Sequence, residues 1–347
     1  MDDPYGAGCM NALDQSLSAE RVPRGAEPLL VDVQDVSVRF RRKQTLQGLL
    51  RQGPATFRAV AEVNLTIGRQ EVVGLVGESG SGKTTLGRTI LRLIEPTEGA
   101  IVFEGQDITH LRERQLRRVW RRMALVFQDP LSSLNPRHTI RTALATPLRV
   151  SGGVSGREAE EHVAAALQRV RLPLSALDRY PHELSGGQLQ RAALARAMML
   201  SPALVIADEA VSKLDVSVRS QILNLLKDLQ AALHISFLFI THDLHVARFI
   251  CDRIAVMFFG RIVETAPAAE LFRSPRHPYT RALLSTLDNR TGKADDTRRG
   301  LVDPEQRGCI YQSQCPRRIA RCQDAHPSTA PAGGDHSVAC YNPLMEG

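Results

Sequence analysis

Residues Gly77–Thr84 read GESGSGKT and follow the apolar run Glu71–Val76, which we interpret as a buried strand. A glycine-rich loop between a strand and a helix points consecutive backbone N–H groups at the helix N-terminus, where the helix dipole also favours phosphate. Gly77, Gly80 and Gly82 would permit such a loop. The string by itself leaves open a glycine-rich turn that binds nothing.

The polar residues of this loop suit a nucleotide. Lys83 offers a point charge to the outer phosphates, and the Thr84 hydroxyl stands where a magnesium ligand is expected. A first helix is predicted over Thr85–Leu93. The predicted nucleotide-binding residues of this segment are Gly77, Glu78, Ser79, Gly80, Ser81, Gly82, Lys83, Thr84 and Thr85.

A second glycine-containing string, LSGGQ, precedes an amphipathic helix predicted from Gln188 to about Met199. It consists of Leu184, Ser185, Gly186, Gly187 and Gln188. The N-terminus of that helix would be another phosphate-binding pole. Because one nucleotide does not need both poles in one site, we expect the second pole to face a nucleotide held by a neighbouring subunit. The alternative is a loop before a core helix.

Acidic and imidazole side chains follow two further predicted strands. The apolar residues 204–206 lead to Asp208 and Glu209, and the strand 236–240 leads to His242. Ligands bind at the carboxyl ends of strands in parallel α/β sheets. Asp208 suits the magnesium shell, Glu209 suits polarising an attacking water, and His242 suits a hydrogen bond to the γ-phosphate.

In this order the motifs resemble the nucleotide-binding subunits of ABC transporters, over about Leu30–Leu287. The resemblance implies that Gln128 contacts magnesium and senses the membrane partner, and that Asp215 is the acid of the D-loop. It also implies that Phe40, at the end of the first strand, stacks on adenine. Phe40 as a core residue at a strand end is the competing interpretation.

Two longer strings narrow the resemblance to the oligopeptide, dipeptide and nickel importer branch. They are FQDPLSSLNPR at Phe127–Arg137 and HPYTRALLS at His277–Ser285, and neither has an evident catalytic role on physical grounds. The chain departs from that branch at Ala210, Val211 and Lys213. These departures bear on the contacts of the D-loop with an opposite subunit.

We predict an α/β fold: a P-loop NTPase with a parallel-sheet nucleotide-binding core, an N-terminal antiparallel β portion and an inserted α-helical subdomain. The expected domains are a disordered tail at 1–28, a nucleotide-binding domain at 29–287 with its helical subdomain at about 129–200, and a small cysteine-containing extension at 288–347. The segment Lys43–Phe57 is predicted as an exposed insertion.

The extension contains Cys309, Cys315, Cys322 and Cys340, spaced C-x5-C-x6-C-x17-C. In a cytosolic chain such a group favours a metal over disulfides, and four thiolates suit either zinc or an iron–sulfur cluster. The family likeness points to a [4Fe–4S] cluster, and zinc or free thiols are the alternatives. Cys9 and Cys251 are interpreted as bystanders.

Composition limits the location and the partners. The 347 residues carry a net charge of +7, but no groove-reading motif appears, so nucleic acid is not an expected partner. No apolar stretch approaches the ~18 residues that span a bilayer, and the N-terminus lacks a signal pattern. We therefore expect a peripheral protein on the cytoplasmic face of the inner membrane, attached through a partner.

These observations predict the ATP-hydrolysing subunit of a peptide-class ABC importer that requires ATP and Mg²⁺. Its expected partners are a second ABC ATPase, identical or homologous, two integral membrane permeases and, indirectly, an extracytoplasmic solute-binding protein. The alternative is a soluble ABC-type ATPase that acts on nucleic acid or ribosomes.

Overall fold

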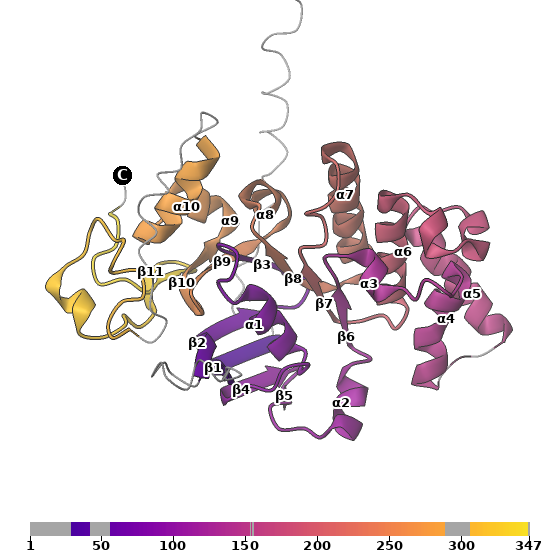
Figure 1. Cartoon of the computed structure of the whole chain (residues 1–347), viewed down its shortest axis with the longest axis horizontal. Helices are drawn as coiled ribbons and strands as arrows, with labels where there is room; N and C mark the ends of the chain where they lie inside the picture. The colour runs from indigo at the N-terminus through magenta and orange to yellow at the C-terminus, as the bar shows by residue number, and fades with distance from the viewer. Residues whose placement is uncertain (1–28, 42–55, 153, 155, 289–305, 346–347) are drawn as a thin grey trace, which may run out of the picture.

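A computed structural model describes residues 29–41, 56–152, 154, 156–288 and 306–345 (Figure 1). The tail predicted at 1–28, with Cys9, lies outside these residues, as do most of the predicted insertion and the segment 289–305. The described chain forms two sheets with helices between and around them. The predicted α/β class, with its antiparallel portion, inserted helices and cysteine-containing extension, is confirmed.

The smaller sheet is antiparallel, with strand order β2-β1-β4-β5. Its strands are β1 (Val31–Arg41), β2 (Thr56–Ile67), β4 (Glu98–Phe103) and β5 (Gln106–Asp107). In β1 the valines at 31, 33, 36 and 38 are all buried although the step from 33 to 36 breaks the alternation. The register shifts at that step and Asp35 has φ 47°, so a bulge returns Val36 to the core face.

The larger sheet is mixed, with order β11-β12-β10-β9-β3-β8-β7-β6. Its strands are β3 (Val72–Val76), β6 (Met123–Val126), β7 (Leu204–Asp208), β8 (Ser236–Thr241), β9 (Arg253–Phe258), β10 (Arg261–Pro267), β11 (Ala330–Gly333) and β12 (His336–Val338). The strands β9, β3, β8, β7 and β6 pair in parallel, as predicted for the core. The remaining pairs are antiparallel.

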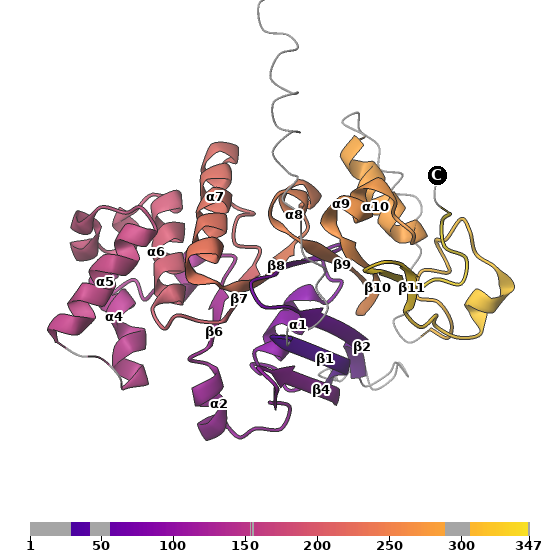
Figure 2. The same ribbon diagram turned by 180° about the vertical axis from the view of Figure 1, so that it is seen from behind.

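Ten α-helices lie in the described ranges, and α4 to α6 form the inserted helical subdomain at one end of the molecule (Figure 2). The helices are α1 (Lys83–Ile90), α2 (Glu113–Val119), α3 (Pro130–Ser133), α4 (Ile140–Ser151), α5 (Arg157–Arg169), α6 (Gly186–Met198), α7 (Val216–Leu233), α8 (Leu244–Ile250), α9 (Ala268–Arg273) and α10 (Pro278–Asp288). The structure starts α6 two residues before the predicted Gln188, because Ser185 is its N-cap.

Hydrophobic cores cover both faces of the larger sheet. Strand β3 is buried throughout, with Val73 and Leu75 in the core shared with α1 and the smaller sheet. Val72 and Val76 face the core of α6, α7 and α8. This two-sided burial explains why β3 is a continuous apolar run instead of an alternating one. It also fixes the loop that follows β3 between two packed layers.

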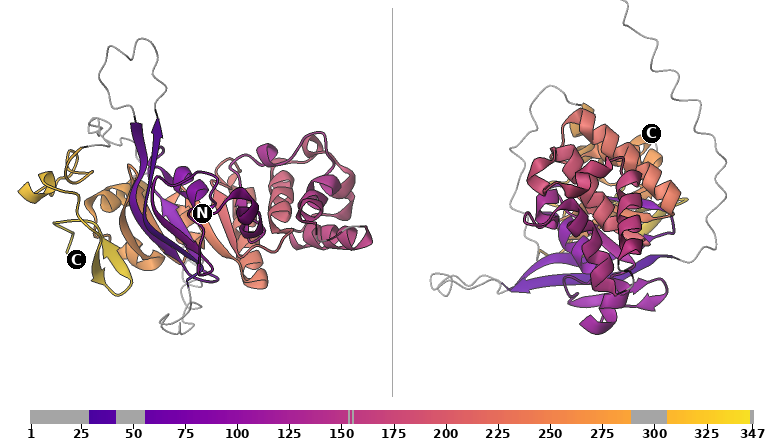
Figure 3. Two further views of the ribbon diagram at one scale, coloured as in Figure 1. Left: turned by 90° about the horizontal axis from the view of Figure 1, so that it is seen from below. Right: turned by 90° about the vertical axis from the view of Figure 1, so that its right-hand side faces the viewer.

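The C-terminal extension is joined to the larger sheet by its hairpin β11–β12, which pairs with β10 (Figure 3). His336 of β12 is buried and hydrogen-bonds Glu264 of β10 (2.7 Å) and Glu270 of α9 (2.9 Å). Burial acts to lower the pKa of His336, but the two carboxylate hydrogen bonds raise it overall. His336 thus fastens the hairpin to β10 and α9 through two carboxylates.

Candidate nucleotide site

Four parallel strands deliver the predicted catalytic segments to one edge of the larger sheet. Strands β3, β8, β7 and β6 are consecutive neighbours, so their carboxyl ends lie side by side. They are followed respectively by the Gly77 loop, His242, Glu209 and, one residue after Phe127, Gln128. This edge is where ligands bind in parallel α/β folds.

The loop after β3 needs glycine at two positions. Gly77 has φ 153°, and a Cβ there would lie 2.1 Å from the Met257 carbonyl oxygen. Gly82 has φ 102°, and its Cβ would lie 2.4 Å from the Ala59 carbonyl oxygen. The loop therefore passes close to the backbones of β9 and β2, and a side chain at either position would displace it.

Lys83, the first residue of α1, is 5% exposed and folds back over its own loop. Its Nζ donates to the carbonyl oxygens of Gly77 (2.9 Å) and Glu78 (2.7 Å). Burial lowers the pKa of Lys83, and the nearby carboxylates of Glu209, Asp208 and Glu78 oppose that shift. An anionic ligand would replace these neutral carbonyl acceptors with charged oxygens, which bind the ammonium group more strongly.

Asp208 lies at the end of β7 and accepts a hydrogen bond from the Thr84 hydroxyl at 2.9 Å. Burial raises the pKa of Asp208, and the hydrogen bond from Thr84 partly offsets that rise. The two residues predicted to share a magnesium ion are therefore already adjacent. A divalent cation beside them would favour the charged carboxylate.

Glu209 is held between the other two predicted catalytic side chains. The Gln128 amide donates to Glu209 Oε2 at 2.7 Å, and His242 Nδ1 lies 3.1 Å from Glu209 Oε1. Glu209 has φ 48°, in the left-handed region that non-glycine residues rarely adopt, and its N–H donates to the Ile240 carbonyl oxygen at 3.0 Å. Such strained residues are concentrated at functional sites.

A pocket of about 200 Å³ opens over the loop, and Glu209 lines one side of it. The other lining residues are Phe57, Ala59, Ser79, Gly80, Gly82, Lys83, Thr84 and Thr85. Phe57 was not predicted as a site residue. It pairs directly with Phe40 across β1 and β2, so both rings lie on the same face of the smaller sheet. Phe40 itself is 41% exposed and does not line the pocket.

The LSGGQ segment lies away from this pocket. None of Leu184, Ser185, Gly186, Gly187 and Gln188 lines it. The Ser185 hydroxyl accepts from the Gln188 N–H (3.3 Å), and the Gln188 side chain accepts from the Ser185 N–H (3.1 Å). This capping box stabilises the start of α6, and both the N-cap Ser185 and the first helical residue Gly186 are exposed.

The departures near the D-loop divide between core and surface. Ala210 and Val211 are buried, whereas Lys213 and Asp215 are exposed. Sequence reasoning missed Arg219, which pairs with Asp243 (2.9 Å) and donates to the Leu214 carbonyl oxygen (3.2 Å). Arg219 thereby ties the D-loop to the turn that carries His242. Its position on a helix face gave no signal of this contact.

The four cysteines of the extension lie near one another. Burial raises the pKa of Cys309 to about 11, with a smaller rise from the charges of the other three thiols. Nevertheless, the described residues contain no group of three or more His, Cys, Asp or Glu side chains placed to hold one metal ion. The structure therefore gives no support to the predicted iron–sulfur or zinc site. Cys251 is buried at the end of α8.

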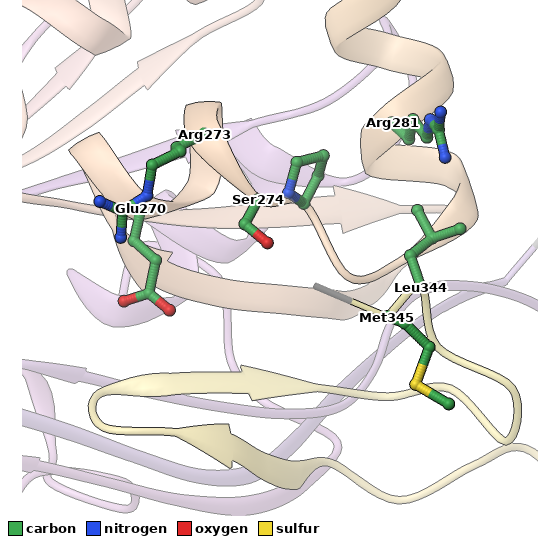
Figure 4. A pocket seen from close by; sticks show the side chains of 7 residues that line it. Glu270, Arg273, Ser274, Arg281, Leu344 and Met345 are labelled. Carbon is green, nitrogen blue, oxygen red and sulfur yellow. The ribbon is translucent and has the colours of Figure 1, made fainter. Parts of the chain in front are cut away.

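A second pocket, of about 520 Å³, lies between α9, the start of α10 and the C-terminal segment (Figure 4). It is lined by Glu270, Arg273, Ser274, Pro275, Arg281, Leu344 and Met345. None of these residues belongs to the predicted nucleotide site. Its carboxylate, Glu270, is already engaged by His336.

Sequence comparisons place the chain in a family. Residues 60–212 match the ABC transporter model, and residues 263–322 match the model of the oligopeptide/dipeptide transporter C-terminal region. A Brucella ovis protein named as a peptide import ATP-binding protein is 46% identical over 82% of this chain and 92% of its own length. The oligopeptide transport ATP-binding protein AppF of Bacillus subtilis is 43% identical over 85% of this chain and 92% of its own length.

Solved structures agree with this placement. The ATP-binding cassette MJ0796, in a dimeric post-hydrolysis state bound to ADP and phosphate, is similar with TM-score 0.60 and 29% identity. The match covers 69% of this chain and 98% of that one. The structure of cbiO1 from Clostridium perfringens, part of the ABC transporter complex cbiONQ, matches with TM-score 0.61 and 26% identity, over 71% of this chain and 91% of that one.

The chain belongs to the ATP-binding subunits of ABC transporters and is an ABC-type ATPase. The predicted resemblance is confirmed, and the alternative of an ATPase acting on nucleic acid or ribosomes is not favoured. Within the described ranges, no helix has the length and apolar character that crossing a bilayer requires.

Proposed function

We propose that this chain binds ATP at the loop Gly77–Thr85 and hydrolyses it at an interface with a second ABC ATPase, to drive uptake of peptides or a related solute through partner permeases. The observation that carries the proposal is the convergence of Lys83, Glu209 and His242 at the end of neighbouring parallel strands. The dimeric cassette matched above supports the two-subunit arrangement.

Each site residue has a proposed role. Lys83 binds the outer phosphates, Glu209 orients and polarises the attacking water, and His242 binds the γ-phosphate. Gln128, which already touches Glu209, reports the state of the site to the membrane subunits. Ser185 and its neighbours complete the site of the opposite subunit, with Asp215 at the seam between subunits.

The residues around Thr84 fit a magnesium ion. Mg²⁺ usually keeps several waters and takes few protein ligands together with phosphate oxygens. Thr84 and Asp208 would hold it, with Gln128 nearby, so the lack of a three-residue metal group in the described part of the chain is compatible with this role. When bound, the ion neutralises charge on the phosphates.

For the adenine ring we propose a platform of two aromatic side chains instead of Phe40 alone. Phe57 lines the pocket, and Phe40 is its partner on the adjacent strand. The ring of an adenine stacks well on such a surface. The proposed domain division remains that predicted from the sequence, except that Phe57 belongs to β2 and the extension shares the larger sheet.

The assignment to a peptide importer can be tested by identifying the proteins that co-purify with the chain. The C-terminal family match and the names of its relatives support peptide import. We expect the tagged chain, extracted from its own host in mild detergent, to co-purify with two integral membrane permeases and a second ABC ATPase. Recovery of ribosomes or nuclease-sensitive nucleic acid in place of the permeases would contradict the assignment.

The four-cysteine extension carries a separate proposal, a [4Fe–4S] cluster. Its support is the spacing of the cysteines in the sequence and the family resemblance. Protein purified without oxygen should contain iron and sulfide and absorb at about 400 nm, and Cys322→Ser should lose all three signals. Cys251→Ser is the matched control, because Cys251 lies at the C-terminal end of α8 and outside the extension. Anaerobic protein without iron would remove the proposal.

A further inference from the structure

The hydroxyl of Tyr279 reaches the phosphate loop from a distant part of the chain. Tyr279 is in the first turn of α10, 201 residues after Glu78, and is 2% exposed. The backbone N–H of Glu78 donates to the Tyr279 hydroxyl oxygen at 3.2 Å. Tyr279 belongs to the HPYT string, for which sequence reasoning found no role.

This hydrogen bond acts on the peptide group that also holds Lys83. The Glu78 N–H and the Gly77 carbonyl belong to one peptide unit, and Lys83 Nζ donates to that carbonyl at 2.9 Å. Because a peptide unit is planar, fixing its N–H also fixes the direction of its carbonyl oxygen. Tyr279 thus sets the orientation of a group that positions Lys83.

Aromatic packing connects Tyr279 to the cysteine extension. The Tyr279 ring lies 4.4 Å from that of Phe258 and 5.5 Å from that of Tyr311, measured between centroids. Tyr311 is itself 5.3 Å from Phe258 and follows Cys309 by two residues. The three rings form one buried cluster between β9, α10 and the extension.

The backbone before Tyr279 is fixed in the same way. The Tyr279 N–H donates to His277 Nδ1 (3.0 Å), and the His277 N–H donates to Glu264 (3.0 Å). Burial lowers the pKa of His277 to about 4, so its imidazole is neutral near pH 7 and can accept this bond. Glu264 is also the partner of His336 in the extension's hairpin. Displacement of the extension would therefore disturb both the ring contact and the backbone anchor of Tyr279.

We propose that Tyr279 is a positioning residue for the phosphate loop, and that Tyr311 couples the cysteine extension to the nucleotide site through it. This inference rests on the proposed assignment of Gly77–Thr85 as the ATP site. Its consequence is that changes in the extension alter nucleotide affinity without any residue of the extension touching the nucleotide.

The first test measures ATP binding and steady-state hydrolysis with the full chain carrying Tyr279→Phe, which removes only the hydroxyl. Loss of one such hydrogen bond should raise the Kd and KM for ATP by about 3- to 10-fold while kcat changes little. Tyr341→Phe is the control, since Tyr341 lies in the extension, where its ring packs on Arg321. A variant with purely structural damage would lose folded fraction instead, leaving the KM of the remaining enzyme unchanged.

The second test examines the coupling. Tyr311→Leu removes the ring next to Tyr279 and should weaken ATP binding, whereas Tyr311→Phe keeps the ring and should restore it. In the double variant, Tyr311→Leu should raise the Kd for ATP by less than it does in the otherwise wild-type chain, because both substitutions act through the same contact. Additive effects in the double variant, or equal effects of the leucine and phenylalanine variants, would overturn the link to the extension.

Lys83→Ala separates failure of this inference from failure of the proposed ATP site. If Lys83→Ala loses ATP binding but Tyr279→Phe binds ATP like the wild type, the positioning role of Tyr279 is wrong and the site stands. If Lys83→Ala binds ATP as tightly as the wild type, the site assignment itself fails.

Discussion

Replacing Glu209 with glutamine should abolish turnover while ATP still binds, with hydrolysis reduced by about 10²- to 10⁴-fold. The substitution removes the negative charge that polarises water but keeps the shape of the side chain. The amide oxygen of the new side chain can still accept from Gln128, and its NH₂ group can donate to His242 Nδ1. Both hydrogen bonds of position 209 can therefore still form. The variant should accumulate as a closed dimer with MgATP, because release depends on hydrolysis.

The chain offers a closely matched control for this experiment. Glu104 has the same φ of 48° as Glu209, and it pairs on the surface with Arg122 (3.0 Å), away from the pocket. Glu104→Gln should therefore retain hydrolysis and remain in the normal monomer–dimer equilibrium. ATPase rates and light scattering with MgATP measure both properties. Near-normal hydrolysis by Glu209→Gln would reject Glu209 as the residue that activates water.

Replacing Ser185 with arginine should reduce the rate of ATP hydrolysis by about 100-fold or more, without weakening ATP binding to the isolated chain. Ser185 is exposed at the start of α6 and does not line the pocket around Lys83. We therefore expect it to act on a nucleotide held by the opposite subunit, where a bulky cation would prevent closure. A cis role would instead weaken the chain's own ATP binding.

The comparison for Ser185→Arg is the same substitution at Ser285, which is exposed on α10. Binding is measured by calorimetry on each isolated variant, and hydrolysis is measured with the natural partner ATPase present. If Ser185→Arg loses ATP affinity to the extent that Lys83→Ala does, the two phosphate-binding poles belong to one site, and the two-subunit arrangement is wrong.

Sequence patterns predicted the segments in which local chemistry and position agree. The Gly77–Thr84 loop, the residues after β7 and β8, and the glycine-containing segment before α6 each combine a strand or helix end with the residue types that such an end requires. The residue types at the end of a strand or helix are local features, so they can be recognised in a single sequence.

The missed features depend on contacts between distant residues. Phe57 was placed in an insertion because no pattern indicated that β2 begins at Thr56. Tyr279 meets Glu78 across 201 residues, and Arg219 meets Asp243 only because α7 and α8 pack beside one another. The sequence around a helix residue or an aromatic residue does not indicate which distant residue it contacts. These contacts become visible only when the sheet order is known.

The hairpin β11–β12 has a consequence for any shortened form of this protein. It covers the outer side of β10, whose N–H and C=O groups would otherwise be open to pairing with another molecule. Without it, Glu264 would also be an interior carboxylate that has lost its hydrogen-bond partner His336, which is costly. Cutting the chain before Cys309 would thus give an aggregation-prone, poorly soluble polypeptide. The extension therefore protects the edge of the larger sheet.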